Sequence, residues 1–495
     1  MSATLLLILV SAYFCLLLGV AWYTSRNANN DSFFIGNRNS NWMLVAFGMI
    51  GTSLSGVTFV SVPGKVGISH FSYLQVVIGY FFGYFIVAYV LLPIYYRMQL
   101  TSIYRYLEHR FGSWAYKTGA FFFIISRTVG ATARLYLVIN VLQVFILDNL
   151  GVPFAVTTFV LLLMILLYTF EGGVKTIVFT DTLQTTFMLL GLVVCIYYIM
   201  DHLHISVGQT WNALQAKGYT RVFDTDVNGG GFWLKQILGG AFITVAMTGL
   251  DQEMMQKNIS VRSLGDSQKN MITFSIVMVL VNILFLFLGG LLYLFKDATH
   301  AVPATGDYLF PTIALQSGLP GMVAFVFIIG LISALFPSAD GALTALTSSF
   351  CIDILGLRKR QDLDEKRRTR IRQGVHLGMA LVFFICVLLF KHLNDRSIID
   401  TILALAGYTY GPLLGLFVFG IFSKRSIPES PAVLVICLVA PVICYFLSLY
   451  SKAWFHGYQI GVELLLINAA LTFTGLLAIS RASKVHPLAA RTGRP

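Results

Sequence analysis

Charged side chains are scarce in this sequence, because Asp, Glu, Lys and Arg together make up 11% of its 495 residues. A typical soluble domain carries roughly 25%. Hydrophobic residues reach 57%, and the mean hydropathy is +0.78. Apolar runs of about 20 residues are long enough to cross a bilayer as helices. The composition therefore excludes a soluble globular domain and predicts an all-α polytopic membrane protein.

Cysteine and histidine are also few, and their positions exclude several kinds of chemistry. The six cysteines lie in or beside apolar runs and form no CxxC pair, so they predict neither a disulfide framework nor a metal site. None of the nine histidines lies in the middle of an apolar run, which argues against an intramembrane acyltransferase or metalloprotease. The sequence has no credible HExxH, phosphate-loop or nucleophile-elbow motif. We predict that the chain is not an enzyme.

The apolar runs predict about thirteen membrane-spanning helices. Their approximate ranges are 3–24, 42–66, 73–97, 117–147, 152–170, 175–200, 232–257, 270–296, 318–355, 373–391, 400–422, 431–450 and 459–480. The first run lacks the basic start and the cleavage site of a signal peptide, so we count it as a span. The ninth is too long for one crossing, and we expect its end at residues 351–357 to project into water.

Lysine and arginine predict the orientation, because basic flanks of membrane helices remain in the cytoplasm. An extracellular N-terminus and an odd number of spans place most of the 34 Lys and Arg residues inside. The basic run at 358–372 is the strongest element, and we interpret it as a loop against anionic lipid rather than a nucleic-acid site. The prediction is a multi-pass protein of the plasma (inner) membrane with a cytoplasmic C-terminus.

Seven charged residues stand out within the predicted spans. They are Arg127, Arg134, Asp181, Asp251, Glu253, Asp340 and Glu463. An ionisable group at membrane depth costs about 3 kcal/mol or more unless it is paired, so it indicates an ion or substrate path. Asp340 is the most conspicuous, because residues 325–350 around it are otherwise apolar or small. Arg127 and Arg134 share one helix face, and either internal pairing or a solute carboxylate would account for them.

Small and hydroxylic residues interrupt two of the predicted spans. The run GMIGTSLSGVTF fills residues 48–59 of the second span, and Gly239-Gly240 and Gly249 interrupt the seventh. A broken helix exposes backbone carbonyls, which are tolerated only where they line a cavity or bind an ion. Paired interruptions predict an inverted-repeat transporter in which spans 2–6 oppose spans 7–11. Close helix packing is the alternative explanation of such glycines.

A hard cation such as Na⁺ needs several oxygen ligands, and the interrupted span and the ninth span can supply them. By position, the candidates are the carbonyls of Gly51 and Leu54, facing Ala334, Ser338 and Asp340. Ser338 and Asp340 are two residues apart on a helix and point in different directions. We therefore expect them to have neighbouring but separate roles, unless Pro337 distorts the helix.

Five motifs, in the right order, resemble the sodium:solute symporter family, which includes Na⁺-coupled sugar, sialic acid, proline, pantothenate and iodide carriers. They are GTSLSGVTFVSVPG (51–64), LTSIYRYLEHRFG (100–112), GGVKTIVFTDTLQ (172–184), GLDQEMMQKNIS (249–260) and ALAGYTYGPLLGLFVFGIF (404–422). The resemblance covers almost the whole chain and implies a leucine-transporter-like five-plus-five inverted repeat, with one extra helix before it and two after. The implied divisions are 1–41, the first repeat 42–200, an extracellular loop 201–231, the second repeat 232–422, and 423–495.

The resemblance also implies where one or two Na⁺ ions bind. The principal site maps to Gly51, Leu54, Ala334, Pro337 and Ser338. Pro337 stands where many members have a serine, so one hydroxyl ligand is missing. A second site of some members maps to Thr180, Asp181, Asp340 and Gly341. Asp340 replaces a serine there, and we hypothesise that it compensates for the lost hydroxyls as a Na⁺ ligand or as a protonation site. Two buried carboxylates would repel unless a cation or proton lay between them.

The implied function is Na⁺-coupled import of a small polar solute, such as a sugar, a sialic-acid-type compound, an amino acid or a carboxylate, by alternating access. The candidate substrate residues are Ser53, Ser55, Thr58, Gln75, Arg127, Arg134, Asn140 and Tyr408. Proton coupling or exchange through Asp340 is the first alternative, and a solute-sensing transceptor is the second. The expected partners are the solute, Na⁺ and the lipid bilayer, with no nucleic acid and with the oligomeric state left open.

Overall fold

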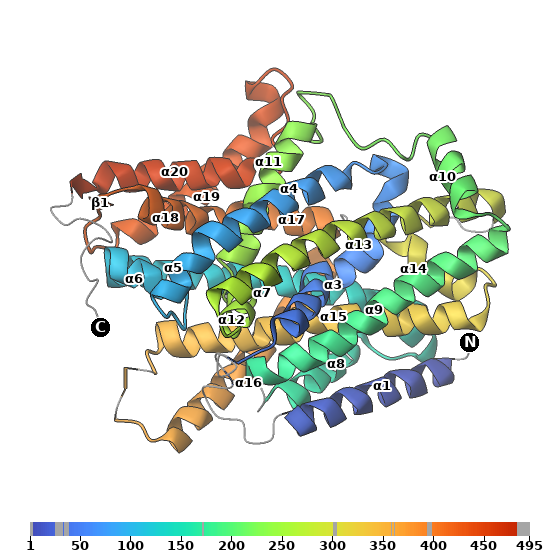
Figure 1. Cartoon of the computed structure of the whole chain (residues 1–495), viewed down its shortest axis with the longest axis horizontal. Coiled ribbons are helices and arrows are strands. Elements are labelled where there is room, and N and C mark those ends of the chain that lie inside the picture. The colour runs from blue at the N-terminus through green and yellow to red at the C-terminus, as the bar shows by residue number, and fades with distance from the viewer. Residues whose placement is uncertain are drawn as a thin grey trace.

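The computed structural model is almost entirely helical. It describes residues 3–24, 33, 39–170, 173–299, 304–357, 359–360, 362–393 and 398–482. Within these ranges the only named strands are β1 (Arg425–Ser426) and β2 (Arg481–Ala482), which pair antiparallel. The long helices lie side by side and roughly along one direction (Figure 1). The prediction of an all-α protein is confirmed.

The helices follow the predicted apolar runs closely. They are α1 (Ala3–Thr24), α3 (Trp42–Ser69), α4 (Tyr73–Ile86), η2 (Val87–Leu91), α5 (Leu92–Arg97), α6 (Arg105–Phe111), α7 (Ser113–Leu142), η3 (Gln143–Leu147), η4 (Asp148–Leu150), α8 (Phe154–Thr169), α9 (Gly173–Leu203), α10 (Val207–Ala216), α11 (Trp233–Thr244), η5 (Val245–Gly249), α12 (Gln252–Ile259), α13 (Leu264–Thr299), η6 (Gly306–Tyr308), α14 (Leu309–Gln316), α15 (Gly321–Ser349), η7 (Phe350–Ile354), α16 (Glu365–Leu393), α17 (Ile398–Thr409), α18 (Gly411–Phe422), α19 (Ala432–Trp454) and α20 (Leu464–Ile479).

The described helices include fewer candidate membrane spans than the sequence predicts. Among the described residues, eight helices are long and apolar enough to cross a membrane, or ten if each of two bent pairs counts as one span. Three shorter apolar helices coincide with the predicted first, fifth and thirteenth spans: Ile8–Thr24, Phe154–Thr169 and Leu464–Ile479. The last two are shorter than a usual crossing of about 20 residues, whereas the whole of α1 has 22 residues. The predicted count of thirteen is therefore not confirmed.

Two breaks lie in spans that the sequence predicts to be interrupted. α3 contains one non-helical residue, Ser55, with φ 44° and ψ 174°. The second break bends the chain by 66° between η5 and α12. Asp251 caps the new helix there, because its side chain accepts hydrogen bonds from the backbone N–H groups of Glu253 and Met254. The predicted interruption at Gly249 is thus confirmed.

The predicted interruption at Gly239-Gly240 is wrong, because α11 is continuous through both residues. A Cβ added to Gly240 would lie 2.4 Å from the carbonyl oxygen of Val76 on α4. Gly240 therefore allows α11 and α4 to approach closely rather than breaking α11. A further bend of 46° separates α17 from α18, within the run that we predict as one span.

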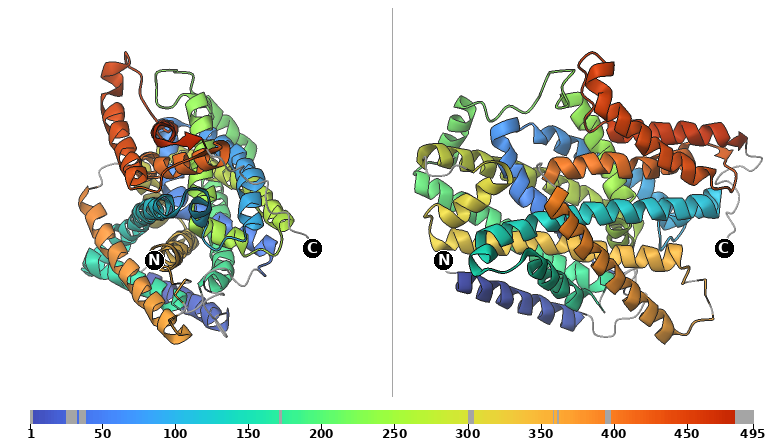
Figure 2. Two further views of the ribbon diagram at one scale, coloured as in Figure 1. Left: turned by 90° about the vertical axis from the view of Figure 1, so that its left-hand side faces the viewer. Right: turned by 180° about the vertical axis from the view of Figure 1, so that it is seen from behind.

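α15 is the most enclosed membrane helix, with 83% of its apolar window buried, against 22% for α16 and for α19. Figure 2 shows α15 inside the bundle and α16 and α19 at its periphery. We predict that the end of the ninth span projects into water, and this is wrong. Cys351, Ile352 and Asp353 are buried, because Phe33 packs against Cys351 and Ile352.

The two ends of the bundle carry different elements (Figure 1). One end carries α10 and α14, and we call it the α10 end. The opposite end carries α6 and the segment between η7 and α16, and we call it the α6 end. Lys359 joins these two parts of the α6 end through an ion pair, in which its Nζ lies 2.5 Å from Oε1 of Glu108.

Candidate functional site

A cavity lies between the two broken spans, with an empty volume of about 780 Å³ that includes open solvent. Residues from α3, α4, α7, α11, η5, α12, α13 and α17 line it. Its wall combines apolar side chains, such as Ile243 and Ile402, with hydroxyl groups and two guanidinium groups. The arrangement suits a small solute that is partly apolar and carries a polar or charged group.

Five of the eight predicted substrate residues line this cavity: Ser53, Ser55, Thr58, Arg127 and Arg134. The structure places the other three elsewhere. The fully buried Gln75 donates to the carbonyl oxygens of Ser72 and Gly231. Asn140 donates to the hydroxyl of Tyr308 at 2.9 Å. The carbonyl oxygen of Tyr408 accepts a hydrogen bond from Asn468. These three residues hold helices and loops together away from the cavity.

Sequence reasoning misses several polar residues of the cavity wall. They are Tyr73, Tyr80, Tyr84, Thr244, Thr248 and Asn282. The three tyrosines are seven and four residues apart, so they share one face of α4. The hydroxyls of Tyr73 and Tyr80 lie 3.5 Å from each other. This spacing is the signal that would have identified them.

The two arginines of α7 share the cavity but differ in their partners. Arg127 is buried, and its Nη2 forms an ion pair with Oε2 of Glu253. Its Nε lies 3.7 Å from Oδ2 of Asp251. Within the part of the chain that the structure describes, no carboxylate lies within ion-pair distance of Arg134. Internal pairing therefore accounts for Arg127, and Arg134 retains a positive charge that faces the cavity.

A buried ion network lies beside the cavity, where α12 meets α3 and α9. Nζ of Lys257 lies 2.7 Å from Oδ2 of Asp181, 2.7 Å from Oγ1 of Thr52 and 3.3 Å from Oε1 of Glu253. Lys257 is only 3% exposed, and Asp181 is fully buried. Sequence reasoning does not single out Lys257. Its spacing of four residues from Glu253, which favours an ion pair on a helix, is the signal for it.

The residues predicted for the principal Na⁺ site lie on facing segments of α3 and α15. All five, Gly51, Leu54, Ala334, Pro337 and Ser338, are buried. A Cβ built on Gly51 would lie 3.5 Å from Cγ of Pro337. Ser55 breaks α3 immediately after Leu54, and Pro337 has no N–H to donate to the carbonyl oxygen of Ser333. Backbone oxygens at both segments therefore lack regular helical partners.

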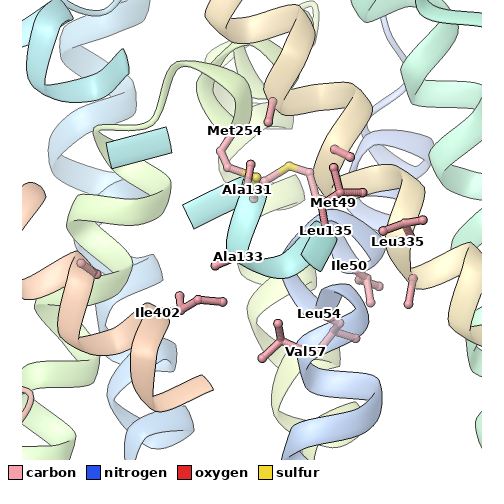
Figure 3. Packing of buried hydrophobic residues seen from close by; sticks show 14 of the residues in the cluster. Met49, Ile50, Leu54, Val57, Ala131, Ala133, Leu135, Met254, Leu335 and Ile402 are labelled. Atoms are coloured by element: carbon pink, nitrogen blue, oxygen red, sulfur yellow. The ribbon is translucent and has the colours of Figure 1, made fainter. Parts of the chain in front are cut away.

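The surroundings of this site are apolar on one side and hydroxylic on the other. Figure 3 shows Met49, Ile50 and Leu54 of α3 near Leu335 of α15. On the α9 side, the hydroxyl of Thr185 accepts a hydrogen bond from the backbone N–H of Gly51 at 3.1 Å. Thr185 is fully buried and absent from the sequence prediction. It follows Asp181 by four residues, so it lies on the same face of α9.

Several polar groups predicted for a second Na⁺ site have partners within the protein, whereas Oδ1 of Asp181 is buried without a hydrogen-bond partner among the described residues. The hydroxyl of Thr180 donates to the carbonyl oxygen of Ile177 on its own helix at 3.2 Å. The carboxylate of Asp340 accepts hydrogen bonds from the hydroxyl of Tyr168, at 2.7 Å, and from the backbone N–H of Gly341. Asp181 binds the ammonium group of Lys257. The cation beside Asp181 is therefore a side chain.

Two broken helices beside a polar cavity and a buried ion network define a secondary transporter of the membrane. The model of the sodium:solute symporter family matches residues 33–432. The chain belongs to this family.

Two bacterial relatives illustrate the similarity. The chain is 23% identical over 463 residues to the sodium/sialic acid symporter SiaT of Proteus mirabilis, with 89% of each chain covered. It is 24% identical over 484 residues to the sodium/sialic acid symporter NanT of Aliivibrio fischeri, with 95% of this chain and 93% of the relative covered.

Solved structures show the fold. A substrate-bound, outward-open Na⁺-coupled sialic acid symporter superposes with a TM-score of 0.82 at 18% identity, covering 97% of this chain and 99% of that one. A nucleobase-cation-symport-1 family transporter, in a closed conformation with bromovinylhydantoin bound, gives 0.52 at 14% identity, covering 92% and 95%. The chain has the leucine-transporter-like fold. It is a multi-pass, Na⁺-coupled symporter of small organic solutes and not an enzyme.

Proposed function

We propose that this chain imports a small solute bearing a carboxylate together with Na⁺ across the plasma membrane. The observation that carries the proposal is the guanidinium group of Arg134, which lines the cavity and has no carboxylate partner in the described chain. A planar guanidinium binds a carboxylate through two parallel hydrogen bonds. An unpaired charge at membrane depth is costly, so a solute carboxylate would stabilise the occupied cavity.

The remainder of the cavity supports a solute with both polar and apolar parts. The hydroxyls of Tyr73, Tyr80 and Thr248 offer hydrogen bonds, while Ile399 and Leu403 supply apolar contacts. Similar proteins are named for anionic solutes. They include the two sialic acid symporters and the sodium-coupled monocarboxylate transporter 2 of Danio rerio, 25% identical over 414 residues.

The break in α3 gives a physical basis for coupling between Na⁺ and solute. Ser53 and Ser55 line the cavity, and the carbonyls of Gly51 and Leu54 belong to the same helical turn. In our proposal, Na⁺ binds these carbonyls together with oxygens of Ala334, Pro337 and Ser338, and so holds the break in the shape that forms the solute site. Na⁺ and solute then stabilise one conformation of the protein, which is positive coupling between two sites.

The proposed orientation places the α10 end outside the cell and the α6 end in the cytoplasm. Basic residues gather at the α6 end, where Arg105, Arg110, Lys359 and Arg360 lie on α6 or between η7 and α16. Basic flanks of membrane helices remain in the cytoplasm. A cysteine introduced at position 360 should therefore react with a membrane-impermeant maleimide only in inside-out vesicles.

A thermal-shift screen of the purified chain tests the proposed substrate class. We expect carboxylates such as N-acetylneuraminate, lactate or nicotinate to raise the melting temperature in NaCl but not in choline chloride, because a ligand stabilises the state that binds it. Arg134→Gln should remove this shift, whereas Arg221→Gln, at an exposed loop position, should retain it. Stabilisation by neutral sugars alone, retained in Arg134→Gln, would refute a carboxylate substrate.

A further inference from the structure

One buried oxygen in the cavity wall has no hydrogen-bond partner among the described residues. It is Oδ1 of Asn282 on α13, a residue that lines the cavity and is 1% exposed. The other end of the same amide is bound, because Nδ2 donates to the carbonyl oxygen of Met278 at 2.8 Å. A carbonyl oxygen can only accept, so this bond determines which end of the amide is the nitrogen. The unpaired group is therefore a hydrogen-bond acceptor.

The side chain of Asn282 has little to do for the fold. Within the described residues, its amide forms a hydrogen bond only to its own helix and links no two helices. A buried acceptor without a donor is unfavourable, because it has lost the hydrogen bonds that water would give it. A donor on a molecule that enters the cavity would satisfy Oδ1. The arrangement therefore indicates a contact to the solute.

The charges of the cavity favour a neutral donor. Arg127 and Arg134 line the cavity, whereas no Asp or Glu is among the described residues of its wall. An ammonium group would be repelled by the guanidinium group of Arg134, and its three N–H groups would need three acceptors. A hydroxyl group brings one donor and no charge. A hydroxyl therefore suits Asn282 better than an amine does.

We propose that Oδ1 of Asn282 accepts a hydrogen bond from a hydroxyl group of the solute, and that the transported carboxylates are therefore hydroxylated. The inference rests on the proposed function, because Arg134 binds the carboxylate of the same molecule. Arg134 and Asn282 lie on different helices, α7 and α13, so two helices hold the solute. A site of this kind rejects an analogue that lacks the hydroxyl, because the buried acceptor is then left unpaired.

Ligands that differ in a single group test the inference in the wild-type chain. One set is lactate, propionate and alanine, and another is 4-hydroxybutyrate, butyrate and 4-aminobutyrate. N-acetylneuraminate, which is hydroxylated, and nicotinate, which is not, complete the panel. Thermal-shift titrations of the purified full-length chain in NaCl give an apparent Kd for each ligand. We expect the tightest ligand to be hydroxylated, with a Kd about tenfold or more below those of the plain and amino carboxylates.

Asn282→Leu is the informative variant, because it removes the acceptor and keeps a side chain of similar size. It should raise the Kd of the hydroxylated ligand about tenfold and change the Kd of the plain carboxylates by less than about twofold. The fold should persist, since the amide of Asn282 is bound only to its own helix. Asn212→Leu, at an exposed position of α10, is the matched control and should keep the wild-type Kd values.

The outcomes separate the inference from the proposed function. A plain or amino carboxylate as the tightest ligand would overturn the inference and leave carboxylate symport intact. So would an unchanged Kd of the hydroxylated ligand in Asn282→Leu. If no carboxylate of the panel binds, the proposed function fails instead. Asn282→Ala removes the same oxygen and takes the place of Asn282→Leu if that variant does not fold.

Discussion

Arg127 and Arg134 show how one helix face can carry a structural charge and a functional charge. Arg127 is neutralised by Glu253 and lies close to Asp251, both on the segment that begins α12. It therefore joins α7 to the second broken span. Arg134, two turns further along α7, faces the cavity without such a partner. Because a charge in this environment needs a counter-ion, the missing partner of Arg134 indicates a ligand rather than an architectural role.

Substitution of Arg134 should act on substrate binding rather than on folding. We expect Arg134→Gln to raise the KM for a carboxylate solute by about tenfold or more, since a hydrogen bond to a charged group contributes about 1.5–3 kcal/mol. Arg134→Lys should retain part of the affinity, because lysine keeps the positive charge but cannot form a bidentate pair of hydrogen bonds with a carboxylate. Uptake into proteoliposomes measures both variants. Arg127→Gln should instead lower stability by about 3–5 kcal/mol, because it leaves buried carboxylates unpaired.

Asp340 remains the residue whose role in coupling is most open to test. It is fully buried, and it lies three residues beyond Pro337, where the principal Na⁺ site loses a hydroxyl. We expect Asp340→Asn to raise the Na⁺ concentration for half-maximal uptake by about tenfold, since it removes a negative charge close to a bound cation. Asparagine can still accept the hydrogen bond of Tyr168, so the fold should persist. Unchanged uptake and Na⁺ dependence would contradict a role in coupling.

Tyr168→Phe is the control for Asp340. It removes the hydroxyl that donates to the Asp340 carboxylate at 2.7 Å and leaves the charge in place. Its effect on Na⁺ dependence should therefore be smaller than that of Asp340→Asn. A larger effect in Tyr168→Phe would assign the coupling role to the tyrosine hydroxyl instead.

Residue types that are rare in an apolar background were predictable, but their partners were not. Arg127, Asp181 and Asp340 stand out in the sequence because ionisable groups are costly at membrane depth. Lys257 does not stand out, because it falls at the predicted end of a span. The 66° bend before α12 brings it back into the interior, against Asp181. Periodicity identifies a helix face, whereas the partner of that face depends on tertiary packing.

At the scale of single elements, the break in α3 depends on one residue in an unusual conformation. Ser55 has φ 44° and ψ 174°, a region that glycine occupies more readily than other residues. Composition predicts that this segment is a weak helix, because it is rich in Gly, Ser and Thr. It does not identify Ser55 as the break, since residues 51–58 contain several small residues with similarly weak helix propensity.

Substitutions at Ser55 should distinguish backbone strain from side-chain chemistry. Ser55→Gly removes the steric cost of this conformation and should raise stability by up to about 1 kcal/mol. Ser55→Val should lower it by about 1–3 kcal/mol, because a β-branched side chain disfavours positive φ. Thermal unfolding in detergent compares the two variants. If Ser55→Val were as stable as the wild-type chain, α3 would not depend on this conformation.

The contact between α11 and α4 offers a second test at this scale. Gly240→Ala would place a methyl group 2.4 Å from the carbonyl oxygen of Val76, and backbone atoms cannot move aside as a flexible side chain can. We expect a loss of about 1–3 kcal/mol, typical of overpacking. Gly130→Ala is the matched control, because nothing lies within 4 Å of its added Cβ. Equal melting temperatures for the two variants would contradict close packing at Gly240.

At the scale of the whole molecule, the positions of the helices match the apolar runs of the sequence. A membrane helix must form all of its backbone hydrogen bonds internally and must span a fixed thickness. The described helices therefore match the predicted ranges within a few residues in most cases. Hydropathy does not predict whether a helix lies in the centre of the bundle or at its surface. α15 and α19 are both strongly apolar, yet 83% of one window and 22% of the other is buried. Lipid and protein interiors are similarly apolar, so hydropathy alone cannot separate them.

Alternating access requires the two halves of the molecule to move, and the α10 end provides a place to test that movement. Nζ of Lys65 on α3 lies 2.6 Å from Oδ1 of Asp400 on α17, with side chains 22% and 50% exposed. An exposed ion pair of this kind contributes at most about 1 kcal/mol, so it can open during each cycle. A covalent link between the same two positions could not open during the cycle.

We therefore expect Lys65→Cys/Asp400→Cys, in a background with the six native cysteines replaced, to lose Na⁺-dependent uptake after treatment with a short bismaleimide. Each single cysteine variant should keep most of its uptake under the same treatment, because loss of the ion pair alone costs little. Radiolabelled solute uptake in proteoliposomes gives the measurement. The cross-link is confirmed by cleaving the chain between positions 65 and 400, because the two fragments then stay together on a denaturing gel. Full uptake in the cross-linked protein would mean that α3 and α17 stay together throughout transport. The moving boundary would then have to lie elsewhere in the bundle.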